Sequence, residues 1–231
     1  MAPKSIFRIF LSVVFLYFAG MAFQQQTLLL ITKPLLITSL LWFFLVATKT
    51  NYSAIKWYAA AALFFSTAGD SLLMFAFRTE LFFLAGLVAF LIAHAFYILC
   101  FHHIKTREDV PGKWQWAIVV TIYYAFIMSL LLPNTGSMKL PVILYGLVIS
   151  FMLFVAALLY DLPDNKTARY ILSGALLFVV SDSLLAINKF HHKFEQAGWM
   201  VMATYLAAQV LLAQGIIRYI ASANQKKDPA N

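Results

Sequence analysis

The sequence predicts an all-α membrane protein, a polytopic bundle of about eight transmembrane helices. Of its 231 residues, 63% are hydrophobic and 11% are charged, whereas soluble domains are about 25% charged. The mean hydropathy is +0.83. Apolar stretches of about 20 residues, the length that crosses a bilayer, recur between short polar segments. A soluble domain needs more charged residues on its surface than this chain has. We therefore expect a single integral-membrane domain over residues 1–231.

The first apolar stretch runs from Ile6 to Phe23, and the chain's first basic residues, Lys4 and Arg8, lie at its start. Basic residues ahead of an apolar run are also typical of a signal peptide. This run is about 18 residues, longer than the usual signal-peptide core, and no small-residue cleavage site follows it. We therefore expect it to remain in the protein as the first span.

Polar breaks such as Gln24–Gln26 and Pro133–Gly136 separate the remaining spans. From Ser222 onward the sequence is polar, which is typical of a frayed terminus. The predicted helices comprise residues 6–23, 27–47, 55–76, 81–101, 114–132, 139–160, 168–188 and 197–220.

Basic residues are distributed unevenly between the two ends of these spans. The richer side carries Lys4, Arg8, Lys49, Lys56, Lys105, Arg107, Lys113, Lys166, Arg169, Arg218, Lys226 and Lys227. The other side carries only Arg78, Lys139, Lys189 and Lys193. By the positive-inside rule, this imbalance predicts that both termini are cytoplasmic. We expect the membrane to be a bacterial inner membrane or a eukaryotic endomembrane. The same rule explains the net charge of +8 without nucleic acid, which we do not expect as a partner.

Two stretches of the chain match each other around an aspartate. Gly69-Asp70-Ser71 and Ser181-Asp182-Ser183 are each followed by two leucines inside an apolar run. A shift of 112 residues superposes them and maps the second and third spans onto the sixth and seventh. This favours two parallel four-helix repeats, about residues 6–104 and 114–220. The alternative is chance similarity between apolar helices.

The two aspartates are the strongest candidates for catalysis. An ionised carboxylate inside a bilayer costs about 2.5–3.5 kcal/mol on insertion scales, so such residues usually serve a function. If Asp70 and Asp182 share a site, one protonated and one ionised carboxyl would form an acid–base pair. The alternative is that they hydrogen-bond neighbouring helices and hold the bundle together.

Two further polar residues share the expected depth of the aspartates. Lys33 and Tyr145 are equivalent under the shift, and all four lie about six helical residues, or about 9 Å, from the outer ends of their spans. We therefore expect one cluster, in which Lys33 and Tyr145 are candidates for substrate binding. Lys33 would then pair with an aspartate or, because its side chain is long, extend toward the membrane surface.

Four more polar residues are candidates for substrate binding. His94 and Tyr97 share a helix face with Phe90, Ser181 precedes an aspartate, and Asn188 lies near the end of the seventh span. For His94 the alternative is a hydrogen bond to a neighbouring helix, and for Ser181 it is small-residue packing. Tyr205 and Gln209 form a lower-ranked polar pair at helical spacing.

No metal site or cofactor site is predicted. The pairs His102-His103 and His191-His192 fall in expected loops, where neighbouring side chains need not converge. His94 is far from any zinc-binding pattern, and no glycine-rich phosphate loop is present. The single cysteine, Cys100, permits no intrachain disulfide.

The polar motifs occur in an order that resembles a known family. Lys33-Pro-Leu-Leu, Gly69-Asp70-Ser-Leu-Leu, Ala93-His94-Ala-Phe-Tyr97 and Ser181-Asp182-Ser-Leu-Leu-Ala are similar to motifs of the YhhN-like lysoplasmalogenases. The resemblance extends from the second span through the seventh. It implies an integral-membrane hydrolase that cleaves the vinyl ether of a lysophospholipid. The expected products are a fatty aldehyde and glycerophosphoethanolamine or glycerophosphocholine.

Two other classes of function remain compatible with the sequence. Intramembrane Asp, Lys and His residues are common in proton pathways, so the alternative is a proton-coupled transporter of a small polar solute. A structural membrane scaffold is the third reading. Turnover without a sealed membrane would distinguish an enzyme from a transporter, and a scaffold would tolerate neutral replacement of either aspartate.

Overall fold

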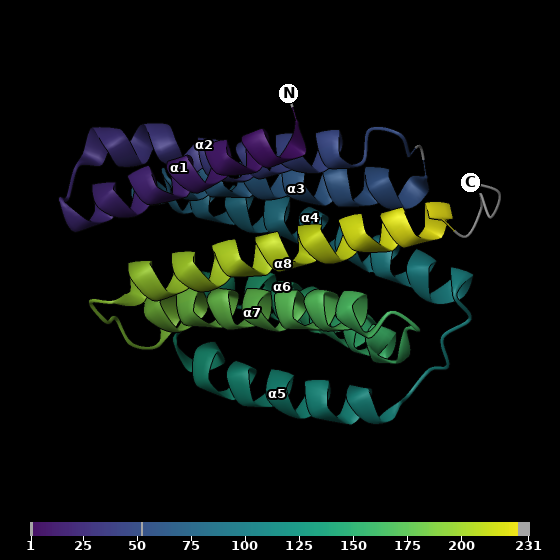
Figure 1. Ribbon diagram of the computed structural model, residues 1–231. Coiled ribbons are helices and arrows are strands. Elements are labelled where there is room, and N and C mark those ends of the chain that lie inside the picture. The colour runs from purple at the N-terminus through teal and green to yellow at the C-terminus, as the bar shows by residue number, and fades with distance from the viewer. Residues whose placement is uncertain (1, 52, 226–231) are drawn as a thin grey trace. The chain divides into compact units, whose positions relative to one another are not determined.

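A computed structural model describes residues 2–51 and 53–225, and in these residues it contains eight α-helices, three short 3-10 turns and no strand. The helices follow one another along the chain with short connections (Figure 1). Their bounds are α1 Pro3–Ala22, α2 Gln26–Ala47, α3 Ala54–Leu73, α4 Glu80–Arg107, α5 Gln115–Leu131, α6 Lys139–Leu158, α7 Asn165–Phe190 and α8 Ala197–Gln225. The predicted all-α class and number of helices are confirmed.

One predicted boundary is clearly wrong, because α4 continues beyond the apolar run. It includes His102 and His103, which we expected in a loop, and ends at Arg107. Lys105 and Arg107 in its last turn interact favourably with the negative end of the helix dipole. Hydropathy indicates where the apolar part of a helix ends. The α4 helix continues beyond that point, so its end was predicted too early.

The C-terminal boundary also differs from the prediction. Ser222 to Gln225 continue α8, whereas we expected a frayed tail from Ser222 onward. Lys226 and Lys227, which contributed to the orientation argument, lie outside the described residues.

Seven of the eight helices are long and apolar enough to cross a membrane. The exception is α3, which has 20 residues but carries Lys56 and Asp70. The protein is therefore an integral, multi-pass membrane protein, and the helix outside this set of seven carries Asp70, one of the two candidate catalytic residues.

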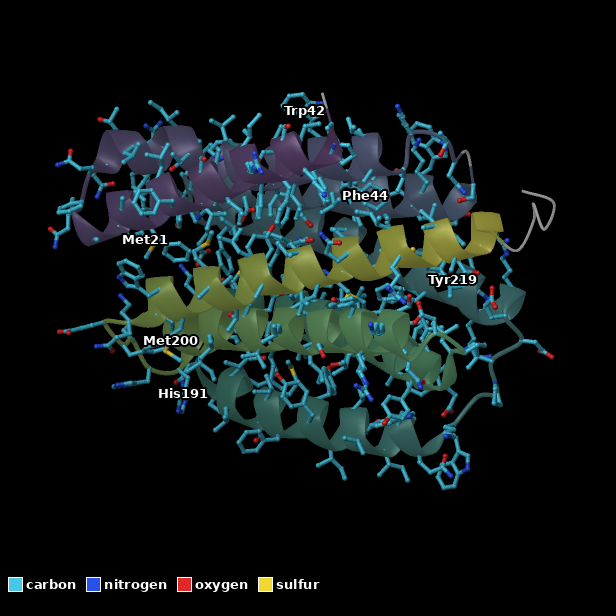
Figure 2. The ribbon with its side chains drawn as sticks, viewed as in Figure 1. Met21, Trp42, Phe44, His191, Met200 and Tyr219 are labelled. Carbon is cyan, nitrogen blue, oxygen red and sulfur yellow. The ribbon has the colours of Figure 1, made fainter. Side chains whose placement is uncertain are left out.

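The chain divides into two compact units. The first comprises Met1–Phe96 and Ile217–Asn231, and the second comprises Tyr97–Ile216. In the first unit α1 packs on α2 and α2 packs on α3. Trp42 and Phe44 illustrate this packing on α2, where Trp42 points away from the neighbouring helices and Phe44 toward them (Figure 2). Phe44 is fully buried, while Trp42 is exposed on the surface expected to meet lipid.

Close contact between α3 and α4 in the first unit depends on two glycines. A Cβ atom added to Gly69 would lie 2.5 Å from the Phe90 ring, and one added to Gly86 would lie 2.6 Å from the Leu73 side chain. Neither position has room for a larger residue. Gly69 directly precedes Asp70, so this close contact lies beside the helix turn that carries the carboxyl.

The second unit contains three mutually packed helices, α5, α6 and α7, with α5 lying alongside the other two (Figure 1). The α7 and α8 helices approach closely at Gly174, where an added Cβ atom would lie 2.8 Å from Leu212. At the end where α5 begins and α6 ends, Lys113 and Asp161 form an ion pair of 2.7 Å. This pair connects two segments that the predicted topology places on the same side of the membrane.

Candidate active site

Asp70 lies in the last turns of α3, within the first unit. Asp70 is 4% exposed, and Ser66, one turn earlier, is fully buried. Tyr17 of α1 is also buried and lies within electrostatic range of Asp70. Gly69 allows Phe90 to cover the neighbouring surface. The carboxyl is thus enclosed by protein on a helix expected to lie in the membrane, which is the setting in which a polar side chain usually has a function.

Lys33 lies on α2 and is half-buried, one residue before Pro34, which is inside the helix. Among the described residues of the first unit, no ion pair joins Lys33 to Asp70. A lysine of this kind is suited to meeting an anionic group that approaches from the membrane surface.

His94 lies on α4 and is fully buried. Its Nδ1 atom donates a hydrogen bond to the Phe90 carbonyl oxygen, one turn earlier in the same helix. The Nδ1 hydrogen is therefore used in a hydrogen bond within α4. Its predicted role in substrate binding stays a prediction.

Tyr97 takes part in a buried polar group in the second unit. Its hydroxyl donates to Gln209 Oε1 at 2.7 Å, and Gln209 Nε2 donates to the Tyr205 hydroxyl at 3.3 Å. Gln209 is fully buried and Tyr97 is 1% exposed. The lower-ranked pair Tyr205 and Gln209 is therefore joined to Tyr97, and the three hydroxyl and amide groups connect α4 with α8.

Asp182 lies on α7 in the second unit and is half-buried. The hydroxyl of Tyr145, on α6, donates a hydrogen bond to Asp182 Oδ2. Two residues that the depth argument placed together are thus in direct contact. A carboxylate oxygen that accepts such a bond has a fixed orientation, which a group transferring protons requires.

The residue after Asp182 is also engaged by a tyrosine. The hydroxyl groups of Tyr123, on α5, and Ser183 are hydrogen-bonded to each other. Tyr123 also lies within electrostatic range of Asp182. All three helices of the α5–α7 group therefore contribute a polar side chain to the surroundings of Asp182.

Two other predicted residues have structural contacts. Ser181 Oγ donates to the Val201 carbonyl oxygen at 2.9 Å and so connects α7 to α8. Asn188 Oδ1 accepts a hydrogen bond of 3.2 Å from the Phe194 backbone N–H, in the segment between α7 and α8. These contacts explain a polar residue at each position, and substrate binding by either stays a prediction.

Sequence reasoning did not identify Tyr17 or Tyr123. Both are tyrosines inside apolar helices, where a hydroxyl needs a polar partner because no water is available. This need for a polar partner was the sequence feature that could have identified the two tyrosines. It did not single them out because the chain has 11 tyrosines, and the partner depends on how each helix is rotated.

In the part of the chain that the structure describes, no group of three or more His, Cys, Asp or Glu side chains is placed to hold a metal ion. His191 lies in the segment after α7, at the end of the helices (Figure 2). The polar side chains described above include carboxyl and hydroxyl groups, which donate and accept protons.

Comparisons with known proteins cover most of the chain. A family model described as the YhhN family matches residues 28–216, which include both aspartates. Lysoplasmalogenase TMEM86B of Rattus norvegicus is 32% identical over 77% of this chain and 68% of the relative. Lysoplasmalogenase TMEM86A of Bos taurus is 30% identical over 75% of this chain and 72% of the relative. A lysoplasmalogenase of Mycobacterium bovis is 32% identical over 67% of this chain and 58% of its own length.

No solved structure matches the chain. The matched region begins inside α2 and ends inside α8, so it contains every predicted site residue. By this match and by the identity to several relatives, the chain belongs to the YhhN family.

Proposed function

We propose that this chain is a lysoplasmalogenase, a membrane hydrolase that cleaves the vinyl ether bond of a lysophospholipid. The observation that carries the proposal is the family match over residues 28–216, together with relatives named lysoplasmalogenases in mammals and mycobacteria. Two aspartates in apolar helices supply groups that suit the reaction.

The reaction requires a proton and a water molecule. Protonation of the carbon–carbon double bond gives an oxocarbenium ion at the carbon bonded to the ether oxygen. Water adds to that carbon and loses a proton, which gives a hemiacetal. The hemiacetal then collapses, with cleavage of the bond to the glycerol oxygen, to a fatty aldehyde and glycerophosphoethanolamine or glycerophosphocholine. One water molecule is consumed and no net proton is used.

Asp70 and Asp182 are the proposed catalytic residues. One carboxylic acid would supply the proton, and the other, as a carboxylate, would stabilise the cation and accept a proton from water. Glycoside hydrolases meet a similar demand with two carboxyl groups and an oxocarbenium-like transition state. Two carboxyls that share one site would titrate as a pair, so the roles of acid and base are not divided between them.

The remaining polar residues would bind the substrate. Lys33, which makes no ion pair with Asp70 in the described part of the first unit, suits the lipid phosphate. His94 would orient water or substrate from the buried face of α4. With both termini in the cytoplasm, the aspartates would lie in the outer half of the membrane, near the depth of a lysolipid's vinyl ether.

The deciding experiment is an assay of the purified protein in detergent. We expect aldehyde release from an alkenyl lysophospholipid and none from the acyl lysophospholipid with the same headgroup. The acyl substrate is the matched control, because it separates vinyl ether hydrolysis from esterase activity. Turnover in detergent also excludes a transporter as the explanation, since no gradient exists. No release by folded protein would refute the proposal.

A further inference from the structure

Hydroxyl groups from three different residues surround Asp182 in the α5–α7 group. Tyr145 of α6 donates to the carboxyl itself, and Tyr123 of α5 bonds the neighbouring Ser183. We propose that Tyr145 and Tyr123 are positioning residues that hold the Asp182 carboxyl in the orientation needed for proton transfer. This inference rests on the proposed function, and it assigns Tyr145 a task other than substrate binding.

The direction of each hydrogen bond follows from counting hydrogens. The Ser183 hydroxyl has one hydrogen, and it donates that hydrogen to the Val179 carbonyl oxygen at 2.6 Å. Tyr123 must therefore be the donor in its bond to Ser183. The result is an ordered chain from Tyr123 through Ser183 to the backbone of α7, which fixes the helix turn that carries Asp182.

The packing of α5 against α6 holds the two tyrosines in place. A Cβ atom added to Gly146, the residue after Tyr145, would lie 2.7 Å from Met128 Cε and 3.0 Å from the Tyr124 ring. The Tyr124 hydroxyl donates weakly to the Ile143 carbonyl oxygen at 3.4 Å. The close approach of α5 at this glycine brings Tyr123 to α7 beside the point where Tyr145 meets Asp182.

This arrangement affects catalysis through the carboxyl group. A hydrogen bond from Tyr145 to Oδ2 restricts rotation of the carboxyl, so the group stays aligned with the reacting atom. Misplacement of a catalytic group by about 1 Å can cost about 100-fold in rate. The bond is also charge-assisted whenever Asp182 is ionised, which makes it one of the stronger contacts in the unit.

The first test removes one hydroxyl at a time. Tyr145→Phe is expected to lower kcat for aldehyde release about 10- to 100-fold with KM nearly unchanged, as for loss of a hydrogen bond to a charged group. Tyr123→Phe is expected to have a smaller effect of the same kind. Tyr124→Phe is the matched control on the same helix, and it should leave kcat unchanged. A Tyr145→Phe enzyme with native kcat, or with only KM altered, would overturn the proposal.

The second test asks whether Tyr145 acts through Asp182. The double variant Tyr145→Phe with Asp182→Asn should be no slower than Asp182→Asn alone, because the positioned group is already gone. Multiplied losses would show that Tyr145 acts independently and would contradict a positioning role.

A third measurement does not depend on activity. The infrared bands of the Asp182 carboxyl are those that disappear in Asp182→Asn. We expect these bands to shift in Tyr145→Phe and to stay in place in Tyr124→Phe. Shifted bands in a protein that releases no aldehyde would refute the proposed function while supporting the contact. Unshifted bands in an active protein would refute the positioning role alone.

Discussion

A carboxyl group inside an apolar helix is stable only where polar side chains accompany it. Asp70 has Tyr17 of α1 within electrostatic range, and Asp182 has Tyr145 of α6 and Tyr123 of α5. Tyr17 and Asp70 lie on the first and third helices of the chain, and Tyr123 and Asp182 lie on the fifth and seventh. Each aspartate thus has a tyrosine from another helix within electrostatic range, and at Asp182 the Tyr145 hydroxyl donates to the carboxyl itself.

Neutral replacement of either aspartate should abolish most activity. Because general acid–base groups contribute about 10²- to 10⁴-fold, Asp70→Asn and Asp182→Asn should each lower kcat by at least about 100-fold. Asparagine has nearly the same shape as aspartate but neither donates an acidic proton nor accepts one as a carboxylate. The measurement is aldehyde release by each variant, and helical circular dichroism with size-exclusion chromatography in detergent verifies folding.

The double variant shows whether the two aspartates act as a unit. If they do, Asp70→Asn combined with Asp182→Asn should be about as slow as either single variant. A single variant that retains a near-native rate would remove that residue from the mechanism.

The contact between α3 and α4 positions Asp70 at the scale of whole helices. Gly69→Ala would place a methyl group 2.5 Å from the Phe90 ring, so the ring or one of the two helices must shift. Overpacking of this kind costs about 1–3 kcal/mol. We expect a lower thermal unfolding temperature in detergent and reduced aldehyde release, because Asp70 moves with α3.

Gly112→Ala is the matched control for this substitution, since an added Cβ atom there meets nothing within 4 Å. Its unfolding temperature should equal that of the native protein. Adding Phe90→Leu to Gly69→Ala should restore part of the lost stability by making room for the methyl group. A Gly69→Ala protein as stable as Gly112→Ala would contradict the described packing.

The helices themselves were predictable, whereas their side-chain partners were not. Apolar runs mark spans because the bilayer demands about 20 such residues, and this predicted α2 within a residue of its start. The end of α4 was missed because the helix continues past the apolar run through His102 and His103. Tyr145 was placed beside Asp182 by depth alone, but Tyr123 depends on the rotation of α5, which a nearly uniform apolar helix does not reveal.

At the scale of the whole chain, one hydrogen bond bears on the predicted duplication. Tyr97 and Gln209 are 112 residues apart, the same shift that superposes the aspartates, and they contact each other directly. A contact between equivalent residues is what a two-fold repeat produces close to its axis. The duplication stays a prediction, and the contact is a further reason to make it.

The topology of the α6–α7 pair determines which side of the membrane Asp182 lies closer to. Tyr145 lies near the start of α6, and α6 begins just after the 3-10 turn Gly136–Met138. The segment between α6 and α7 is at the opposite end of this pair. The side of the membrane that Ser137 faces is therefore the side nearest the contact between Tyr145 and Asp182.

Cysteine labelling of intact cells measures this orientation directly. Ser137 lies just before α6 and Asn165 begins α7, so these exposed residues mark opposite ends of the helix pair. The native Cys100 is buried, and Cys100→Ala supplies the background. Since the positive-inside rule places both termini in the cytoplasm, Ser137→Cys should react with a membrane-impermeant maleimide in intact cells. Asn165→Cys should react only after the membrane is permeabilised, and each variant is the control for the other. The reverse pattern would move Asp182 to the cytoplasmic half, so that lysolipid would enter from the inner leaflet while the proposed chemistry stays the same.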